Sequence, residues 1–239
     1  MKEENLLKLK TGAAQLGIEL TEKQLQRFEI YADFLLQYNQ KINLTTVTDE
    51  FEIIEKHFLD SLTVLQLVSL RSGMWVIDIG TGAGFPGVPL LILEPGLQLV
   101  LLDSLGKRLE FLRQLLEKLD LTATMLHARA EDGAHLALHR ERYDLALARA
   151  VAPLPVLLEY CLPYVRSGGR FLALKGPSLT EELSNAQNAL QLLGGRAERD
   201  CCLQLPFSGQ DRRLLLVKKI RQTPTKYPRQ AGTPKENPL

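Results

Sequence analysis

The stretch Trp75-Val76-Ile77-Asp78-Ile79-Gly80-Thr81-Gly82-Ala83-Gly84-Phe85-Pro86-Gly87 decides the fold of this chain. An apolar run ends in a carboxylate, and four glycines then follow within eight residues. Glycine accepts positive φ and lets a ligand approach the main chain where a Cβ would collide. A strand that ends in such a loop and opens into a helix places free amide N–H groups over a pocket. We therefore expect a strand, a ligand-binding glycine loop and a helix here.

Beyond this stretch, apolar strand-like runs alternate with helical ones, which predicts an α/β fold with helices on both faces of a parallel sheet. Two late runs flank the polar turn 206–211 and predict an antiparallel pair that closes one sheet edge, on the far side from the N-terminal helices. Strands are expected at Val76–Ile79, Leu97–Leu102, Thr122–His127, Asp144–Ala148, Arg170–Lys175, Ala197–Leu205 and Arg212–Lys219, and a helix at Lys107–Leu119.

The first 70 residues have helical rather than strand periodicity. Helices are predicted from Glu3 to about Gly17, from Thr21 to Gln40 and from about Asp49 to Leu70, with Thr21 and Gln24 in a capping-box pattern. The last segment, 221–239, has four prolines and four Lys or Arg against one acid, and we expect it to be loosely ordered on its own. Three parts follow: a helical cap (1–72), a main domain (73–220) and a basic, proline-rich tail (221–239).

Composition sets the protein class without identifying a function. With 239 residues, 45% hydrophobic and 24% charged, the chain falls in the ordinary globular class. No apolar run reaches the roughly 18 residues of a membrane span, and the first residues begin an amphipathic pattern rather than a signal peptide, so the expected location is cytoplasmic. Cys161, Cys201 and Cys202 predict neither a disulfide framework nor a metal site.

Charge is distributed unevenly along the chain. Residues 1–70 carry 7 Lys and Arg against 11 Asp and Glu, whereas the remainder carries 22 against 17. This asymmetry is compatible with a polyanionic partner of the C-terminal part, although an imbalance of this size also arises by chance.

The glycine loop permits two interpretations. Residues 82–87 fit the G-x-G-x-x-G dinucleotide fingerprint, with Asp103 about 20 residues beyond its first glycine, which would indicate an NAD-dependent oxidoreductase. The longer string Asp78-x-Gly80-x-Gly82-x-Gly84 resembles the first motif of class I S-adenosylmethionine-dependent methyltransferases, because an acid and an extra glycine precede the fingerprint. That resemblance implies a Rossmann-like, mostly parallel seven-stranded sheet with a closing antiparallel strand. A module that binds S-adenosylmethionine without turnover is a third reading.

Several positions are candidates for holding S-adenosylmethionine. Asp78 can hold the methionine ammonium while the glycine amides hold other parts of the cofactor, and Asp103 can accept two charge-assisted hydrogen bonds from the ribose hydroxyls. Other candidates follow the third and fourth strands, because ligands bind at the carboxyl ends of parallel strands. The expected cofactor-binding set is Asp78, Gly80, Gly82, Gly84, Phe85, Asp103, Ser104, Ala130, Glu131 and Arg149.

The segment after the fourth strand, Ala148-Arg149-Ala150-Val151-Ala152-Pro153, bears on the methyl acceptor. It lacks the Asn/Asp-Pro-Pro-Tyr/Phe sequence that enzymes acting on exocyclic amines place here, and it has no cysteine to attack a cytosine ring. A guanine ring nitrogen already has a lone pair, so its methylation needs alignment rather than a general base. We therefore expect no catalytic base, with Arg149 and Lys175 as positioning candidates.

A more specific resemblance runs from about residue 15 to the C-terminus. The chain resembles the glucose-inhibited division protein B family, bacterial methyltransferases that form 7-methylguanosine in 16S ribosomal RNA of the small ribosomal subunit. This implies cofactor contacts at Gly80, Phe85, Ala130, Glu131 and Arg149, with Phe85 serving for packing. The matching strings are Asn43-Leu44-Thr45, His57-Phe58-Leu59-Asp60-Ser61, Leu102-Asp103-Ser104-Leu105-Gly106-Lys107-Arg108, Ala148-Arg149-Ala150, Ala173-Leu174-Lys175-Gly176, Lys226-Tyr227-Pro228-Arg229 and Gly232-Thr233-Pro234.

With RNA as the implied partner, basic residues near the pocket and in the tail become candidate phosphate contacts. Each could instead be a solvated surface charge. His57 and Asp60 could face the pocket, or could serve as a helix cap or a core hydrogen bond. We expect a monomer without a metal ion. The RNA-binding candidates are Lys107, Arg108, Lys175, Arg212, Arg213, Lys226 and Arg229.

Overall fold

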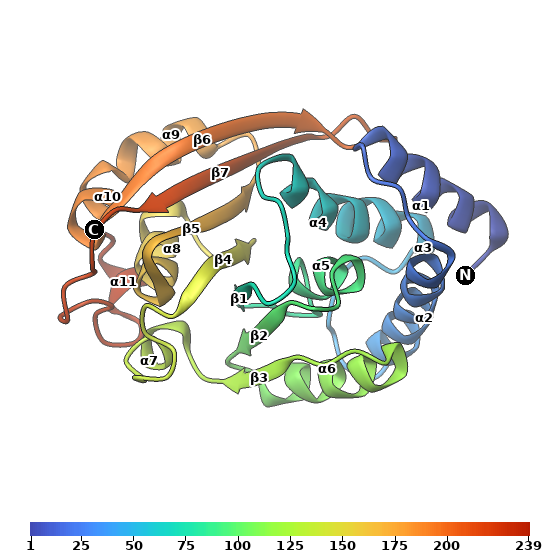
Figure 1. Ribbon diagram of the computed structural model, residues 1–239, viewed down its shortest axis with the longest axis horizontal. Coiled ribbons are helices and arrows are strands. Elements are labelled where there is room, and N and C mark those ends of the chain that lie inside the picture. The colour runs from blue at the N-terminus through green and yellow to red at the C-terminus, as the bar shows by residue number, and fades with distance from the viewer.

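The computed structural model describes all 239 residues, which are arranged around one seven-stranded sheet (Figure 1). The strand order is β3-β2-β1-β4-β5-β7-β6. The first five strands of this order run parallel, and β7 runs antiparallel to both β5 and β6. The predicted α/β class and the antiparallel closing pair are therefore confirmed. The strands are β1 (Trp75–Ile79), β2 (Gln98–Asp103), β3 (Thr124–His127), β4 (Tyr143–Arg149), β5 (Val165–Lys175), β6 (Gly195–Gln204) and β7 (Asp211–Lys219).

Helices cover both faces of the sheet. Alternate side chains of each central strand point to opposite faces, as in β2, where Leu99 and Leu101 join one buried cluster and Val100 and Leu102 join the other. The first cluster contains the N-terminal helices with α5 (Gly87–Leu93) and α6 (Gly106–Leu119). The second contains the helices that follow β4 and β5: α8 (Leu154–Cys161), α9 (Leu179–Asn185) and α10 (Gln187–Leu193).

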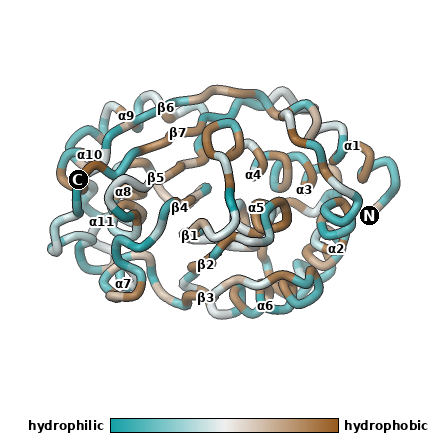
Figure 2. The backbone as a smooth tube through the Cα atoms, in the orientation of Figure 1, coloured by the Kyte–Doolittle hydropathy of each residue, from teal (hydrophilic) through white to brown (hydrophobic).

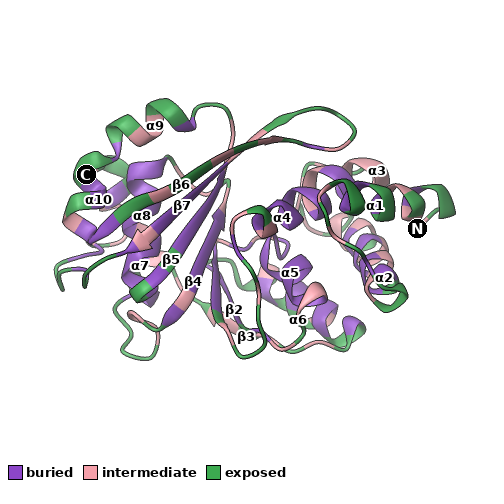
Figure 3. Ribbon diagram, turned by 45° about the horizontal axis from the view of Figure 1, so that its top comes forward, coloured by how far each residue is buried: buried purple, intermediate pink, exposed green.

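Hydropathy and burial agree with this layered arrangement. Figure 2 shows hydrophobic segments along β2, α5 and β7 in the interior of the molecule. In Figure 3, β4, β5 and β7 are largely buried, whereas β6 at the sheet edge is largely exposed or intermediate. No helix combines the length and the hydropathy needed to cross a bilayer.

The N-terminal helices follow the predicted capping signals. α1 (Glu3–Gln15) is followed by Gly17 with φ of 76°, and Thr21 forms a reciprocal capping box with Gln24 at the start of α2 (Glu22–Asn39). The predicted third helix is not one regular α-helix. It comprises α3 (Glu50–Ile53), the π-helical η1 (Ile54–Leu59), α4 (Asp60–Leu62) and the 3₁₀-helical η2 (Thr63–Gln66).

The hairpin of β6 and β7 corrects one expectation. The pair was expected on the side of the sheet far from the N-terminal helices. It does lie at the sheet edge, but its tip reaches over to those helices (Figure 1). The Phe207 and Ser208 amides donate to Glu55 Oε1 at 2.9 and 2.6 Å, and the Phe207 ring packs 5.5 Å from the Phe51 ring. Strands of ten and nine residues are long enough to extend beyond the sheet and make these contacts.

The C-terminal tail is also more ordered than its composition predicts. Arg140 donates to the carbonyl oxygens of Thr223 and Tyr227, both at 2.9 Å. Arg229 forms an ion pair at 2.7 Å with the fully buried carboxylate of Glu159. These polar contacts hold the tail against α8 and against the segment that follows α7 (Ala130–Gly133), and the tail contains the short helix α11 (Thr233–Glu236) near its end.

Candidate functional site

The glycine loop after β1 needs glycine at two positions for steric reasons. Gly80 and Gly84 have φ of 69° and 103°, which side-chain-bearing residues rarely adopt. A Cβ on Gly84 would lie 2.6 Å from the Tyr31 hydroxyl oxygen. A Cβ on Gly80 would lie 2.8 Å from a methyl carbon of Val151. The Tyr31 hydroxyl also donates to the Ala83 carbonyl at 2.5 Å, so α2 helps to fix the loop.

Asp78 lies fully buried beneath this loop. Its Oδ2 accepts hydrogen bonds from the Thr81 hydroxyl at 2.7 Å and from the Gly87 amide at 2.9 Å, whereas Oδ1 has no partner. Burial raises the pKa of Asp78 to about 6. The carboxylate therefore braces the loop, and its free oxygen is suited to the positively charged group of a ligand.

A cavity of about 330 Å³ lies beside the loop at the carboxyl ends of β1 and β2. It is lined by half of the residues predicted to hold the cofactor. Asp78, Gly82, Gly84, Phe85 and Arg149 lie outside its lining. The predicted residues that do line it are Gly80, Asp103, Ser104, Ala130 and Glu131.

Asp103 connects this cavity to the glycine loop. It is only 2% exposed, and its Oδ2 accepts from the Gly82 amide at 3.0 Å and from Arg108 Nη1 at 3.3 Å. Its Oδ1 accepts from the Leu105 amide at 2.9 Å. Carboxylate oxygens keep further lone pairs after one or two hydrogen bonds, so Asp103 can still accept from ligand hydroxyls.

The far wall of the cavity comes partly from the tail, which the sequence did not predict. Glu131 is 5% exposed and accepts from the Gly232 amide at 2.9 Å. Tyr160 from α8 and Lys235 from α11 also line the cavity. Burial, together with the charge of Glu131, raises the pKa of Tyr160 to about 12. No local sequence signal linked α8 or α11 to the glycine loop, because both approach it only through the fold.

A second cavity, of about 410 Å³, adjoins the first. Ala150, the residue after β4, lines both of them and has φ of 55°. A non-glycine residue in this region carries backbone strain, which is concentrated at functional sites. The charged or titratable residues lining the second cavity are Lys56, His57, Asp60, Arg149, Lys175, Glu182 and Arg212.

Arg149 belongs to the second cavity and is held from three directions. Its Nη1 donates to Asp60 Oδ2 at 2.8 Å and to the Lys56 carbonyl at 3.0 Å. Its guanidinium lies 5.0 Å from the centre of the Phe85 ring. Asp60 Oδ1 also accepts from Arg212 Nε at 2.8 Å, so one carboxylate that is 4% exposed joins two arginines. Lys56 lies in the π-helical turn η1, and Asp60 directly follows it. Such turns are frequent at functional sites.

Phe85 itself serves packing, as its apolar side chain suggests. It is buried, and its ring stacks on Tyr31 at 5.2 Å and on His57 at 4.6 Å. The glycine loop, α2 and η1 therefore meet at one aromatic cluster directly below Arg149. This contact couples the position of the loop to the second cavity.

Lys175 and Glu182 form the opposite wall of the second cavity. Lys175 Nζ lies 2.6 Å from Glu182 and donates to the Ala152 carbonyl at 3.1 Å. Glu182 also accepts from the Leu154 amide at 2.7 Å and from the Ser178 hydroxyl at 2.8 Å. Partial burial would raise the pKa of Glu182, but the hydrogen bonds from Lys175, Ser178 and the Leu154 amide outweigh it and lower the pKa. The carboxylate is therefore ionised at neutral pH. Glu182 is a site residue that the sequence did not reveal.

The seven basic residues predicted to contact RNA lie in different surroundings. Lys175 and Arg212 line the second cavity and Arg108 lines the first, whereas the others lie outside both. Lys107 is exposed at the start of α6, and Lys226 Nζ lies 5.2 Å from the centre of the Tyr227 ring. The remaining five each have an acidic partner: Arg108 with Asp103, Lys175 with Glu182, Arg212 with Asp60, Arg213 with Asp200 and Arg229 with Glu159.

His57 carries a pH-dependent contribution to stability. Burial first and the charge of Arg149 second lower the pKa of His57 from 6.5 to about 4. The unfolded chain therefore takes up a proton near pH 6.5, whereas the folded ring does so only near pH 4, and stability is lost as the pH falls through this window. We expect wild type to lose about 3 kcal/mol more unfolding free energy than His57→Gln between these limits.

Urea unfolding of both proteins at several pH values across this window measures the difference. The comparison isolates His57, because Asp78, whose raised pKa has the opposite effect on stability, is unchanged in both. Parallel curves for the two proteins would contradict the assignment.

Comparison with known proteins places these observations in a family. The model of the family described as "rRNA small subunit methyltransferase G" (GidB) matches residues 24–213. A ribosomal RNA small subunit methyltransferase G from Alkaliphilus metalliredigens is 49% identical over 237 residues, covering 99% of each chain. One of the same name from Acetivibrio thermocellus is 50% identical over 229 residues, covering 95% of this chain and 94% of the relative.

Solved structures resemble the fold at much lower identity. TrmN from Thermus thermophilus is 21% identical with a TM-score of 0.53, covering 70% of this chain and 53% of that one. An S-adenosylmethionine-dependent O-methyltransferase from Thermotoga maritima is 15% identical with a TM-score of 0.52, covering 79% and 72%. These likenesses confirm the predicted class I methyltransferase fold.

Proposed function

The chain belongs to the rRNA small subunit methyltransferase G family, and from this membership we propose that it methylates 16S ribosomal RNA of the small ribosomal subunit, with S-adenosylmethionine as donor and nitrogen 7 of one guanine as acceptor. The observation that carries the proposal is the pair of cavities meeting at Ala150. One adjoins the glycine loop, and the other is lined by charged side chains suited to a nucleotide. Two adjoining cavities are what a transfer between two bound molecules requires.

The first cavity suits the donor, which supplies an electrophilic methyl group on its sulfonium when bound. The ribose hydroxyls have an acceptor in Asp103, and Glu131 is available toward the adenosine. The unpartnered Asp78 Oδ1 can interact with the methionine ammonium, directly or through water. The residues present therefore fit S-adenosylmethionine. No group of three or more His, Cys, Asp or Glu side chains is placed to hold a metal ion.

The second cavity suits a guanine and its phosphate. Arginine and lysine can donate to O6 of guanine and to phosphate oxygens, which leaves the lone pair of nitrogen 7 free, and a carboxylate such as Glu182 can accept from the N–H groups of the base. Nitrogen 7 needs no deprotonation, so Arg149 and Lys175 have only to orient the base. Methylation leaves the purine positively charged, and the carboxyl groups of Asp60 and Glu182 lie in the same cavity.

The alternatives are less well supported. Family membership favours methyl transfer over the NAD-dependent oxidoreductase that the G-x-G-x-x-G string alone would allow. A binding module without turnover would not require a second polar cavity next to the donor cavity. We further propose that the enzyme acts in the cytoplasm as a monomer.

The test incubates the purified protein with labelled S-adenosylmethionine and small subunits from a strain that lacks the endogenous activity. A single 7-methylguanosine in 16S rRNA, located by mass spectrometry, is the expected result. Arg149→Ala should abolish it, while Arg142→Ala, a change at the amino end of the same strand region, should not. Donor binding without transfer to subunits or naked RNA would reject the acceptor, and binding of NAD instead of the donor would reject the reaction.

A further inference from the structure

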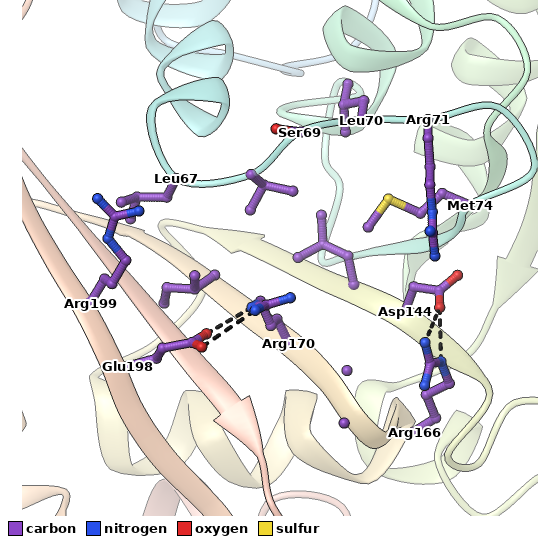
Figure 4. Close-up of a pocket in the computed structure, with 15 residues that line it drawn as sticks. Leu67, Ser69, Leu70, Arg71, Met74, Asp144, Arg166, Arg170, Glu198 and Arg199 are labelled. Atoms are coloured by element: carbon purple, nitrogen blue, oxygen red, sulfur yellow. Dashed lines mark hydrogen bonds and ion pairs between the residues drawn. The ribbon is translucent and has the colours of Figure 1, made fainter.

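A third cavity lies far from the methyl-transfer site. It has a volume of about 600 Å³ and is formed at the amino ends of β4 and β5, the segment 67–74 before β1, and β6 (Figure 4). Asp144 lines this cavity and Arg149 lines the acceptor cavity, and the two lie five positions apart on one strand, about 17 Å at 3.3 Å per residue. One nucleotide cannot occupy both places.

The rim of this cavity is rich in arginine. Arg166 pairs with Asp144 at 2.7 Å, and Arg170 pairs with Glu198 at 2.7 Å, so these two charges are neutralised. The guanidinium groups of Arg71 and Arg199 also line the cavity, from opposite sides in Figure 4, and neither forms an ion pair or a side-chain hydrogen bond. The rim thus has an excess of two positive charges, both on side chains whose planar fork matches phosphate oxygens.

The floor of the cavity is aliphatic. Leu145 and Leu216 are buried there, and Leu67, Val68 and Met74 complete the surface. These aliphatic side chains, bordered by the unpaired Arg71 and Arg199, suit a ligand with an apolar face and anionic ends. A nucleotide of an RNA strand has both, since its base and ribose can lie on side chains while its phosphates meet cations.

We propose that this cavity is a second RNA contact, which holds a segment of the 16S rRNA away from the target guanine. This rests on the proposed function, because it takes the partner to be the same RNA. The free charges of Arg71 and Arg199 bind phosphates of that segment. The contact supplies affinity and orientation, so that the target guanine is presented at the opposite end of β4.

The test is the double variant Arg71→Ala/Arg199→Ala. Both arginines are exposed and unpaired in the wild-type structure, so the variant should fold normally. Binding to naked 16S rRNA and to small subunits is measured by filter binding at several salt concentrations. Near 0.15 M salt the dissociation constant should rise about tenfold, and the slope of log K against log salt should fall by about 1.4, at about 0.7 for each lost phosphate contact on single strands. Affinity for S-adenosylmethionine should not change.

Two comparisons make the result specific. Lys23→Ala/Lys118→Ala removes two exposed positive charges from α2 and α6, outside all three cavities, and should leave the salt slope within error of wild type. Arg71→Lys/Arg199→Lys keeps the charges and should restore most of the slope. An unchanged slope in the alanine variant, or an equal loss in the lysine-to-alanine control, would overturn the proposal.

The remaining outcomes separate this proposal from the proposed function. A loss of affinity for small subunits but not for naked 16S rRNA would overturn the RNA assignment in favour of a ribosomal protein. Wild type that binds RNA through Arg71 and Arg199 but never methylates it would reject the proposed function while leaving this contact intact. Equal methylation of the RNA by wild type and by Arg71→Ala/Arg199→Ala, measured at limiting RNA, would reject the contact alone.

Discussion

Asp103→Ala is expected to weaken S-adenosylmethionine binding by about 100-fold, or about 2.7 kcal/mol. The carboxylate lines the donor cavity, and hydrogen bonds to charged groups contribute roughly 1.5–3 kcal/mol. The substitution also removes the acceptor of the Gly82 amide at 3.0 Å, so the glycine loop loses one of its supports. Isothermal titration calorimetry measures the change, and circular dichroism shows whether the chain remains folded.

Two further variants interpret that loss. Asp103→Asn keeps one acceptor oxygen without the charge, and its affinity should lie between those of wild type and Asp103→Ala. Asp120→Asn removes an acid at the end of α6, where φ is 50° and asparagine is well tolerated, so donor binding should be unchanged. A dissociation constant for Asp103→Ala within twofold of wild type would contradict the placement of the donor.

The parts of the fold that sequence predicts well depend on neighbours along the chain. The capping box of Thr21 and Gln24, the strand before the glycine loop and the helix after it, and the positive φ of Gly80 and Gly84 are all local, and the structure has each of them. The antiparallel closing pair was predictable because a short polar turn joins its strands. Such features need no knowledge of the topology.

The site depends on partners distant in sequence, which explains what was missed. Arg149 was predicted at the end of β4, but its partner Asp60 lies 89 positions earlier, and Arg229 meets Glu159 across 70 positions. No spacing rule connects such pairs until the fold brings them together. The docked tail has the same cause: composition predicts a loose segment, yet buried acids of α7 and α8 hold it.

The predicted RNA contacts stay a prediction, and the structure makes it more specific. Five of the seven basic residues already have carboxylate partners, so a phosphate would have to compete with an acid for each of them. Arg71 and Arg199, which lie in segments without any recognisable motif, are instead unpaired. A count of positive charges along the chain cannot distinguish these two situations, whereas the ion pairs of the folded protein can.

The largest loss of stability from a single substitution is expected at Asp60, and methyl transfer should fall with it. Its carboxylate is 4% exposed and accepts at 2.8 Å from both Arg149 and Arg212. Asp60→Ala would leave two guanidinium groups facing each other beside His57 without a shared counter-ion. Breaking a buried ion pair from one side costs about 3–5 kcal/mol, and we expect a loss in this range by urea unfolding.

Methyl transfer by Asp60→Ala should fall further than the loss of folded protein explains. Arg149 would keep its hydrogen bond to the Lys56 carbonyl but lose the carboxylate that fixes its second direction. Arg212→Ala is the matched comparison, because it leaves Asp60 paired with Arg149 and should cost only about 1 kcal/mol, with activity largely retained at saturating RNA. If Asp60 serves only as a structural anchor, its variant, assayed well below its unfolding temperature, would transfer methyl groups at the wild-type rate; if it positions Arg149, the rate would be about 100-fold lower even in fully folded protein.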